Sequence, residues 1–200
     1  HGRGHALMAL EVVTYGDPVL RKRAKPVKRI DREVRRLLDE MAEAMEEEEG
    51  LGLAATQIGV PLRLAVCRVE DEIRRVVNPR LVWQSTERIA EVEGCLSLPG
   101  LRAVVERPQA VRVSALDEKG HKISLTGEGM LARCFCHEID HLNGRLFVDL
   151  CQRDTLHWLV RVEPESEEEE VRYERRYTTL EEALDFLLKL RERRHGPEEM

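Results

Sequence analysis

The spacing of apolar residues predicts one strongly amphipathic helix in the first third of the chain. Between positions 31 and 48, apolar residues recur at three- and four-residue intervals, which places them on one helix face. Asp31 is a typical N-cap residue, and Gly50 and Gly52 end the predicted helix. Its apolar face consists of Val34, Leu37, Leu38, Met41 and Met45.

The middle of the chain has shorter apolar runs, which are typical of strands. They cover residues 62–69, 75–77 and 81–83, and a hairpin is predicted for 110–116 and 121–125 around the turn at 117–120. Helical spacing returns over residues 128–142. Asn143 and Gly144 end this second helix, because both residues favour the left-handed conformation that closes helices.

The last fifty residues change in character. Two strand-like segments, 156–162 and 171–177, flank the acidic run 163–170, and together they predict a hairpin with a solvated acidic tip. Thr179 can cap a final helix that packs on the domain. Its apolar positions are Leu180, Ala183, Leu184, Leu187 and Leu190.

This order of elements predicts an α+β fold. We expect antiparallel sheets packed around the second helix, with the amphipathic helix before it and an atypical C-terminal hairpin and helix after it. Residues 1–7 resemble an expression-vector remnant. We expect the main domain over residues 8–150 and a C-terminal extension over 151–200.

Composition narrows the class of protein. The chain has 200 residues and a formal net charge of −6, which argues against a basic DNA-binding surface. No apolar run approaches a membrane span, and no export signal is evident, so we expect a cytoplasmic location without a membrane partner. The five cysteines are an odd number, which predicts free thiols in a reducing compartment.

The second predicted helix carries the motif His137-Glu138-Ile139-Asp140-His141. Residues four apart share a helix face, so the two histidines can hold one divalent metal with Glu138 beside it. Such a metal acidifies a bound water, which can then attack a carbonyl carbon. The motif therefore predicts metal-assisted hydrolysis. The alternative is two partly buried histidines without a metal.

The third metal ligand decides what kind of hydrolase this is. One class of zinc peptidase needs a later histidine at the position of Phe147, so that pattern fails. Another class takes a downstream glutamate, for which Glu163 is a weak candidate in a polar run. Cys95, among small and turn-forming residues at 93–100, offers a thiolate and leaves a fourth position open.

A glycine-rich segment at residues 50–57 adds a third candidate element. Its glycines let the backbone approach a ligand closely, and Gln57 supplies a neutral amide donor. Such an amide, together with a backbone N–H, can stabilise an oxyanion. Alone, the segment is equally compatible with a simple helix-to-strand turn.

Taken together, the segments 50–57, 93–97 and 136–141 resemble the motifs of the polypeptide deformylases, and Tyr15 to Arg21 resembles that family's opening. The resemblance covers about residues 12–149. It implies removal of the formyl group from N-formylmethionyl nascent polypeptides, with release of formate.

The resemblance also implies roles for individual residues. Cys95, His137 and His141 would bind the metal, Fe²⁺ in cells with Zn²⁺, Ni²⁺ or Co²⁺ able to substitute. Glu138 would act as general base and acid, while Gln57 and the Leu96 N–H would hold the oxyanion. Glu93 and Arg107 resemble a family salt bridge. The implied substrate-binding residues are Leu51, Gly52, Glu93, Gly100, Arg102, Met130, Arg133, Cys134 and His137.

Two features depart from the family pattern. Cys136 stands where the family has glutamine, and we interpret it as a tolerated small residue against the sheet. The C-terminal fifty residues also depart, because family tails are often a simple helix whereas this one adds a hairpin before it. Its basic end, 189–194, predicts a solvated helix face, with a weak ribosome contact as the alternative. Two other functions stay open: a zinc peptidase or other amidase, and a non-catalytic metal-binding relative. Retention of Glu138 and Gln57 argues against the latter.

Overall fold

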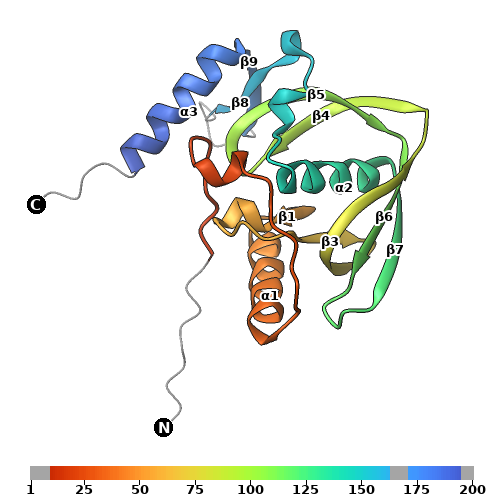
Figure 1. Cartoon of the computed structure of the whole chain (residues 1–200). Helices are drawn as coiled ribbons and strands as arrows, with labels where there is room; N and C mark the ends of the chain where they lie inside the picture. The colour runs from red at the N-terminus through yellow and green to blue at the C-terminus, as the bar shows by residue number, and fades with distance from the viewer. Residues whose placement is uncertain (1–9, 163–170, 195–200) are drawn as a thin grey trace, which may run out of the picture.

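A computed structural model describes residues 10–162 and 171–194, in which two antiparallel sheets surround α2 (Gly129–Leu142) (Figure 1). The predicted α+β architecture with a central motif-bearing helix is confirmed. The five-stranded sheet has the order β1 (Gly52–Ala54), β2 (Leu64–Val69), β3 (Glu72–Gln84), β6 (Ala110–Leu116) and β7 (Lys122–Glu128). The four-stranded sheet has the order β4 (Arg88–Cys95), β5 (Leu98–Pro108), β8 (His157–Val162) and β9 (Arg172–Tyr177).

The first predicted helix is confirmed as α1 (Arg32–Glu47). The Asp31 carboxylate accepts a hydrogen bond from the Val34 N–H at 3.0 Å, as expected of an N-cap. Leu38, Met41 and Met45 are fully buried against the five-stranded sheet, whereas Leu37 is only partly buried. The amphipathic pattern therefore identified the buried face of this helix.

The observed strands differ from the predicted strands in two places. Residues 75–77 and 81–83 belong to one strand, β3, which is interrupted by a register shift between Val77 and Arg80. Asn78 has a φ of 55° there, and its side chain pairs with both backbone groups of Val27 at 2.8 and 2.9 Å. β4 and β5 were not predicted at all, yet they pair along most of their length, from Arg88↔Pro108 to Gly94↔Arg102.

The C-terminal hairpin extends the second sheet. β8 pairs with β5 at Leu101↔Trp158 and Arg102↔His157, and β9 pairs with β8 over its whole length. The predicted hairpin is therefore confirmed in its two strands. Its acidic tip, residues 163–170, and the predicted vector remnant, residues 1–7, lie outside the described residues.

The final helix, α3 (Leu180–Arg194), packs on the end of the molecule that holds the second sheet (Figure 1). Thr179 caps it as predicted: its hydroxyl accepts from the Glu182 N–H at 3.3 Å, and the Glu182 carboxylate accepts from the Thr179 N–H at 3.0 Å. Ala183 and Leu187 are buried in a cluster with residues of the main domain, including Leu20. Among the described helices, none is long and apolar enough to cross a membrane.

Short 3-10 helices connect these elements around the central helix. They are Pro18–Arg21, Ala55–Ile58, Phe147–Asp149 and Arg153–Thr155. The one at Ala55–Ile58 follows β1 directly and carries Gln57, so it places the glycine-rich segment beside α2.

Candidate metal centre

The structure brings together the three residues expected to bind a metal. His137 and His141 share one face of α2, and Cys95 reaches them from the end of β4. Cys95 Sγ lies 3.2 Å from His141 Nε2, which lies 3.2 Å from His137 Nε2. All three ligand atoms lie within 4.8 Å of one another. One thiolate and two imidazoles suit Zn²⁺ or Fe²⁺ and leave a position open.

The electrostatic environment favours the ligand form of the thiol. Burial alone raises the pKa of Cys95, but the positive charge of His141 and hydrogen bonds from both histidines outweigh it. The net pKa of Cys95 is therefore well below the usual thiol range. A thiolate is the form that binds metal, so the protein prepares this ligand through its neighbours.

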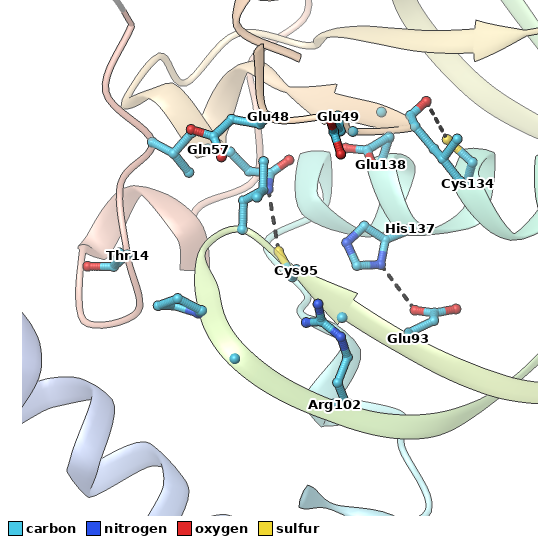
Figure 2. A pocket seen from close by; sticks show the side chains of 18 of the residues that line it. Thr14, Glu48, Glu49, Gln57, Glu93, Cys95, Arg102, Cys134, His137 and Glu138 are labelled. Carbon is cyan, nitrogen blue, oxygen red and sulfur yellow. Dashed lines mark hydrogen bonds and ion pairs between the residues drawn. The ribbon is translucent and has the colours of Figure 1, made fainter. Parts of the chain in front are cut away.

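Glu93 orients the first histidine. Its Oε2 lies 3.1 Å from His137 Nδ1, which leaves His137 Nε2 directed toward Cys95 and His141 (Figure 2). Burial alone would raise the pKa of Glu93, but hydrogen bonds from His137 and Arg107 lower it to about 2. Glu93 therefore stays ionised at neutral pH and holds the histidine ring in one orientation.

Arg107 links this carboxylate to the central helix. It donates to both oxygens of Glu93 at 2.8 and 3.0 Å, and to Asp140 Oδ2 at 2.5 Å. Arg133 donates to Glu93 Oε1 at 2.7 Å. All four side chains are buried, and each carboxylate faces at least one guanidinium, so the charges are compensated. The sequence analysis gave Asp140 no role, although it lies inside the motif.

Glu138 is a buried carboxylate beside His137 and Cys95 (Figure 2). Its Oε2 has no hydrogen-bond partner within the described residues. Burial raises the pKa of Glu138, and the charges of His137 and His141 act in the opposite direction. A carboxylate in this setting is suited to accept and return a proton.

Gly52 leaves the space that Glu138 occupies. A Cβ atom on Gly52 would lie 2.6 Å from Glu138 Oε1 and 2.9 Å from Cys134 Sγ. Both distances are far below van der Waals contact. β1 therefore passes the site at a distance that only glycine allows.

Gln57 is fixed beside Cys95 on the other side of the site. Its Oε1 accepts from the Ala54 N–H at 3.0 Å, so its amide N–H groups face Cys95 Sγ at 3.4 Å and Ser97 Oγ at 3.5 Å. Leu96 lies in the turn between β4 and β5 and lines the same cavity. Ser97 was missed from the sequence because its contact with Gln57 joins positions 40 residues apart.

The ligands open onto a cavity of about 770 Å³. All the expected substrate-binding residues line it: Leu51, Gly52, Glu93, Gly100, Arg102, Met130, Arg133, Cys134 and His137. Besides Glu93 and His137, Arg133 and Cys134 among these residues also have protein partners. Arg133 donates to Glu93 and to the carbonyls of Val105 and Ile89, and Cys134 donates to the Leu51 carbonyl at 3.2 Å.

Cys136 faces away from this cavity. It is buried in an apolar cluster with Val111 and Phe135, and burial raises the pKa of its thiol to about 11. Cys136 is also not part of the group of possible metal ligands formed by Cys95, His137 and His141. The structure thus gives it the surroundings of a small core residue.

A buried glutamate beside two imidazoles and a thiolate, open to a large cavity, defines a metal-dependent hydrolase. The sequence model described as "Polypeptide deformylase" matches residues 9–156. The chain belongs to the polypeptide deformylase family, whose members remove the N-formyl group from new polypeptides. The resemblance stated from the motifs is confirmed.

Individual relatives agree with this assignment. Peptide deformylase of Caldanaerobacter subterraneus subsp. tengcongensis is 49% identical over 134 residues, which covers 67% of this chain and 84% of that protein. Peptide deformylase of Thermoanaerobacter sp. is 44% identical over 158 residues, covering 79% of this chain and 90% of its own length.

Solved structures show how far the similarity extends. A peptide deformylase of Synechococcus elongatus in complex with actinonin matches with a TM-score of 0.69 and 43% identity, over 72% of this chain and 79% of its own. Arabidopsis thaliana peptide deformylase 1B in complex with an inhibitor matches with a TM-score of 0.76 and 32% identity. The Arabidopsis match covers 94% of each chain, so it includes the C-terminal hairpin and helix region.

Proposed function

We propose that this chain hydrolyses the formyl group of N-terminal formylmethionine on newly made polypeptides, with Cys95, His137 and His141 binding one divalent metal. The observation that carries the proposal is three donor atoms within 4.8 Å of one another, next to the buried Glu138 carboxylate. A divalent ion bound there supplies Lewis acidity and an activated water. We infer Fe²⁺ in cells, with Zn²⁺, Ni²⁺ or Co²⁺ as substitutes, because the donor set suits borderline metals.

The protein's own groups perform the proton transfers and hold the developing charge. Glu138 takes a proton from the attacking water and later returns it to the leaving amine, a role supported by its burial and its unpartnered oxygen. The Gln57 amide and the Leu96 N–H hold the formyl oxygen as it gains negative charge. The fixed orientation of Gln57 supports this role, since its oxygen is already bound to Ala54.

We infer that the substrate backbone runs as an added strand along Gly52 and Gly100. Both line the cavity, and β1 and β5 present their backbones on either side of it. The methionine side chain enters the region of Leu51, Met130 and Cys134. Leu51 and Met130 are about half exposed, at 46% and 54%. Exposed apolar side chains of this kind are typical of ligand-binding surfaces.

Phe147 does not supply the third ligand that the zinc-peptidase alternative requires. Phe147, at the position that such a pattern requires, is a buried apolar ring stacked 6.5 Å from the His137 ring. Glu163, the other candidate, lies outside the described residues. We propose Cys95 as the third ligand instead, since its thiol lies with the two histidines.

We also infer that the enzyme acts in the cytoplasm of a bacterial-type cell, consistent with the bacterial origin of its relatives. A weak ribosome contact through the basic end of α3 remains part of the proposal. Lys189 in that segment pairs with Asp185 at 2.6 Å, whereas Arg193 and Arg194 are exposed.

The decisive experiment measures formate release from formyl-Met-Ala-Ser by iron- or nickel-loaded protein prepared without oxygen. The parent should release formate. Glu138→Ala should lose at least about 100-fold in rate while its metal content is unchanged, because the variant lacks only the proton acceptor. Glu43→Ala, an exposed position on α1, is the matched control and should retain full activity.

Two results would change the conclusion. An absence of formate from metal-loaded parent protein would contradict the proposed activity. Cleavage of an internal peptide bond instead would support a peptidase.

A further inference from the structure

The outer rim of the cavity carries five charged residues that are sorted by sign. Glu11 in the N-terminal segment and Glu48 and Glu49 after α1 are acidic, whereas Arg102 on β5 and Arg194 at the end of α3 are basic. Figure 2 shows Glu48 and Glu49 on one side of Cys95, with Arg102 on the opposite side. In this view the two acidic residues that follow α1 lie opposite the basic residue on β5.

Within the described part of the chain, none of these five residues forms an ion pair with another side chain. Charged groups elsewhere on the surface do, as in Arg21–Asp149 and Lys189–Asp185. Among the described residues, the Arg102 side chain donates only to the Leu101 carbonyl, at 3.1 Å, so its charge has no acidic partner there. Charges that line a cavity without an ion-pair partner remain available to a charged ligand.

The position of Arg194 is set by the packing of α3. Three residues earlier, Arg191 donates to the Gly16 carbonyl and to the Asp17 carboxylate, both at 3.2 Å. One turn before that, Leu187 is buried in the core cluster. The helix end is thus attached to the N-terminal segment that also borders the cavity, and Arg194 is carried to the rim by this attachment.

We propose that Arg194 is a specificity-determining residue, which with Arg102 favours substrates that carry a carboxylate side chain downstream of formylmethionine. This inference rests on the proposed function and adds to it a preference in the part of the peptide beyond the methionine. Arg194 touches that part of the peptide and not the formyl group, so it should alter the choice among substrates and leave the chemistry unchanged. The acidic residues Glu48 and Glu49 would favour cationic side chains on their own side.

The test uses amide-capped formyl pentapeptides, formyl-Met followed by four alanines, with Glu or Lys placed singly at positions 3, 4 and 5. In the parent, kcat/KM should be about two- to five-fold higher for Glu than for Lys at one of these positions, the size expected for an exposed ion pair. The ratio should fall toward one as ionic strength rises, because salt screens exposed charges.

Charge reversal supplies the contrast. Arg194→Glu should invert the Glu/Lys ratio, and Arg194→Gln should bring it close to one. Arg193→Glu is the matched control: it makes the same charge change on the adjacent exposed residue, which does not line the cavity, and should leave the ratio unchanged. Arg193→Glu should hydrolyse the neutral pentapeptide at the parent rate, and any loss of the Arg194 variants on that peptide should be smaller than their loss on the Glu-containing peptide.

The outcomes separate this inference from the proposed function. Equal ratios in the Arg194→Glu and Arg193→Glu variants, or an equal loss on neutral and charged peptides in Arg194→Glu, would overturn the role of Arg194. Formate release from the neutral peptide without any charge preference in the parent would do the same. No release from the neutral peptide would overturn the proposed function itself.

Discussion

The helices α1 and α2 pack against the same five-stranded sheet but bury different kinds of side chain. α1 buries only apolar residues, among them Leu38, Met41 and Met45. α2 buries Arg133, Glu138, Asp140 and His141 alongside its apolar positions. Burial of apolar groups stabilises a fold directly, whereas buried charges cost free energy unless partners compensate them. The difference shows that α1 supports the fold and that α2 carries a site that other elements must complete.

The largest expected effect concerns Cys95, the proposed metal ligand that comes from outside α2. Mutation of a residue that supports a metal ligand usually lowers metal affinity by about 10- to 100-fold. Cys95→Ser should lower metal affinity by more than this, because it removes a proposed ligand itself. Metal content after dialysis, measured by elemental analysis, is the readout. Cys136→Gln is the control and should retain parent stoichiometry, since Cys136 faces the core. Unchanged metal in Cys95→Ser would show that the third ligand lies elsewhere.

The second prediction tests the compensation of charge around α2. Arg107→Met should lower the free energy of unfolding by about 3–5 kcal/mol, because Glu93 and Asp140 would be left as buried anions without this partner. Chemical denaturation measures the change. Arg36→Met removes an exposed partner of Glu40 on α1 and should change stability by less than about 1 kcal/mol. Equal losses of unfolding free energy in both variants would mean that ion pairs on α2 contribute no more to stability than ion pairs on α1.

A third substitution examines the apolar side of the comparison. Leu38→Ala on α1 should lower the free energy of unfolding by about 2–5 kcal/mol, because it removes buried methyl groups and leaves a cavity. Its metal affinity and activity at low temperature should match the parent, since Leu38 contacts none of the ligands. A loss of metal in a folded Leu38→Ala protein would refute the separation of roles.

The smallest effect is a pH dependence that belongs to the network of α2. The pKa of Glu93 is lowered from 4.5 to about 2, so its stabilising contribution is complete above pH 4.5 and is lost as the pH falls toward 2. In metal-free protein, the difference in unfolding free energy between the parent and Glu93→Gln should therefore shrink across this window. A difference that stays constant from pH 6 to pH 2.5 would contradict the assignment.

The same contrast explains what could be predicted from the sequence. The buried face of α1 follows from a local repeat, so periodicity alone located it, and the His-Glu-x-x-His spacing placed two ligands on one face of α2. The pairing of β4 with β5 could not be found in this way. β4 alternates weakly, because half of its residues are exposed, and its end at Gly94 and Cys95 resembles a loop.

Long-range partners account for the rest of what was missed. Arg107 and Asp140 are 33 residues apart in the sequence, so no local sequence pattern predicts their contact. The split of β3 into two predicted strands has a local cause, since Asn78 and Pro79 disrupt the alternation although the strand continues beyond them. The role given to Arg194 depends on how α3 is attached near Gly16, a contact across 175 residues.

Gly52 has a consequence for inhibitor resistance. A compound that hydrogen-bonds to the backbone carbonyl at this position binds a group that every amino acid retains. Any side chain introduced there would collide with Glu138 and Cys134, at 2.6 and 2.9 Å from the first added carbon atom. A mutant that escaped the compound in this way would also displace Glu138, the carboxylate proposed to transfer protons, so selection for resistance would be directed to other parts of the cavity.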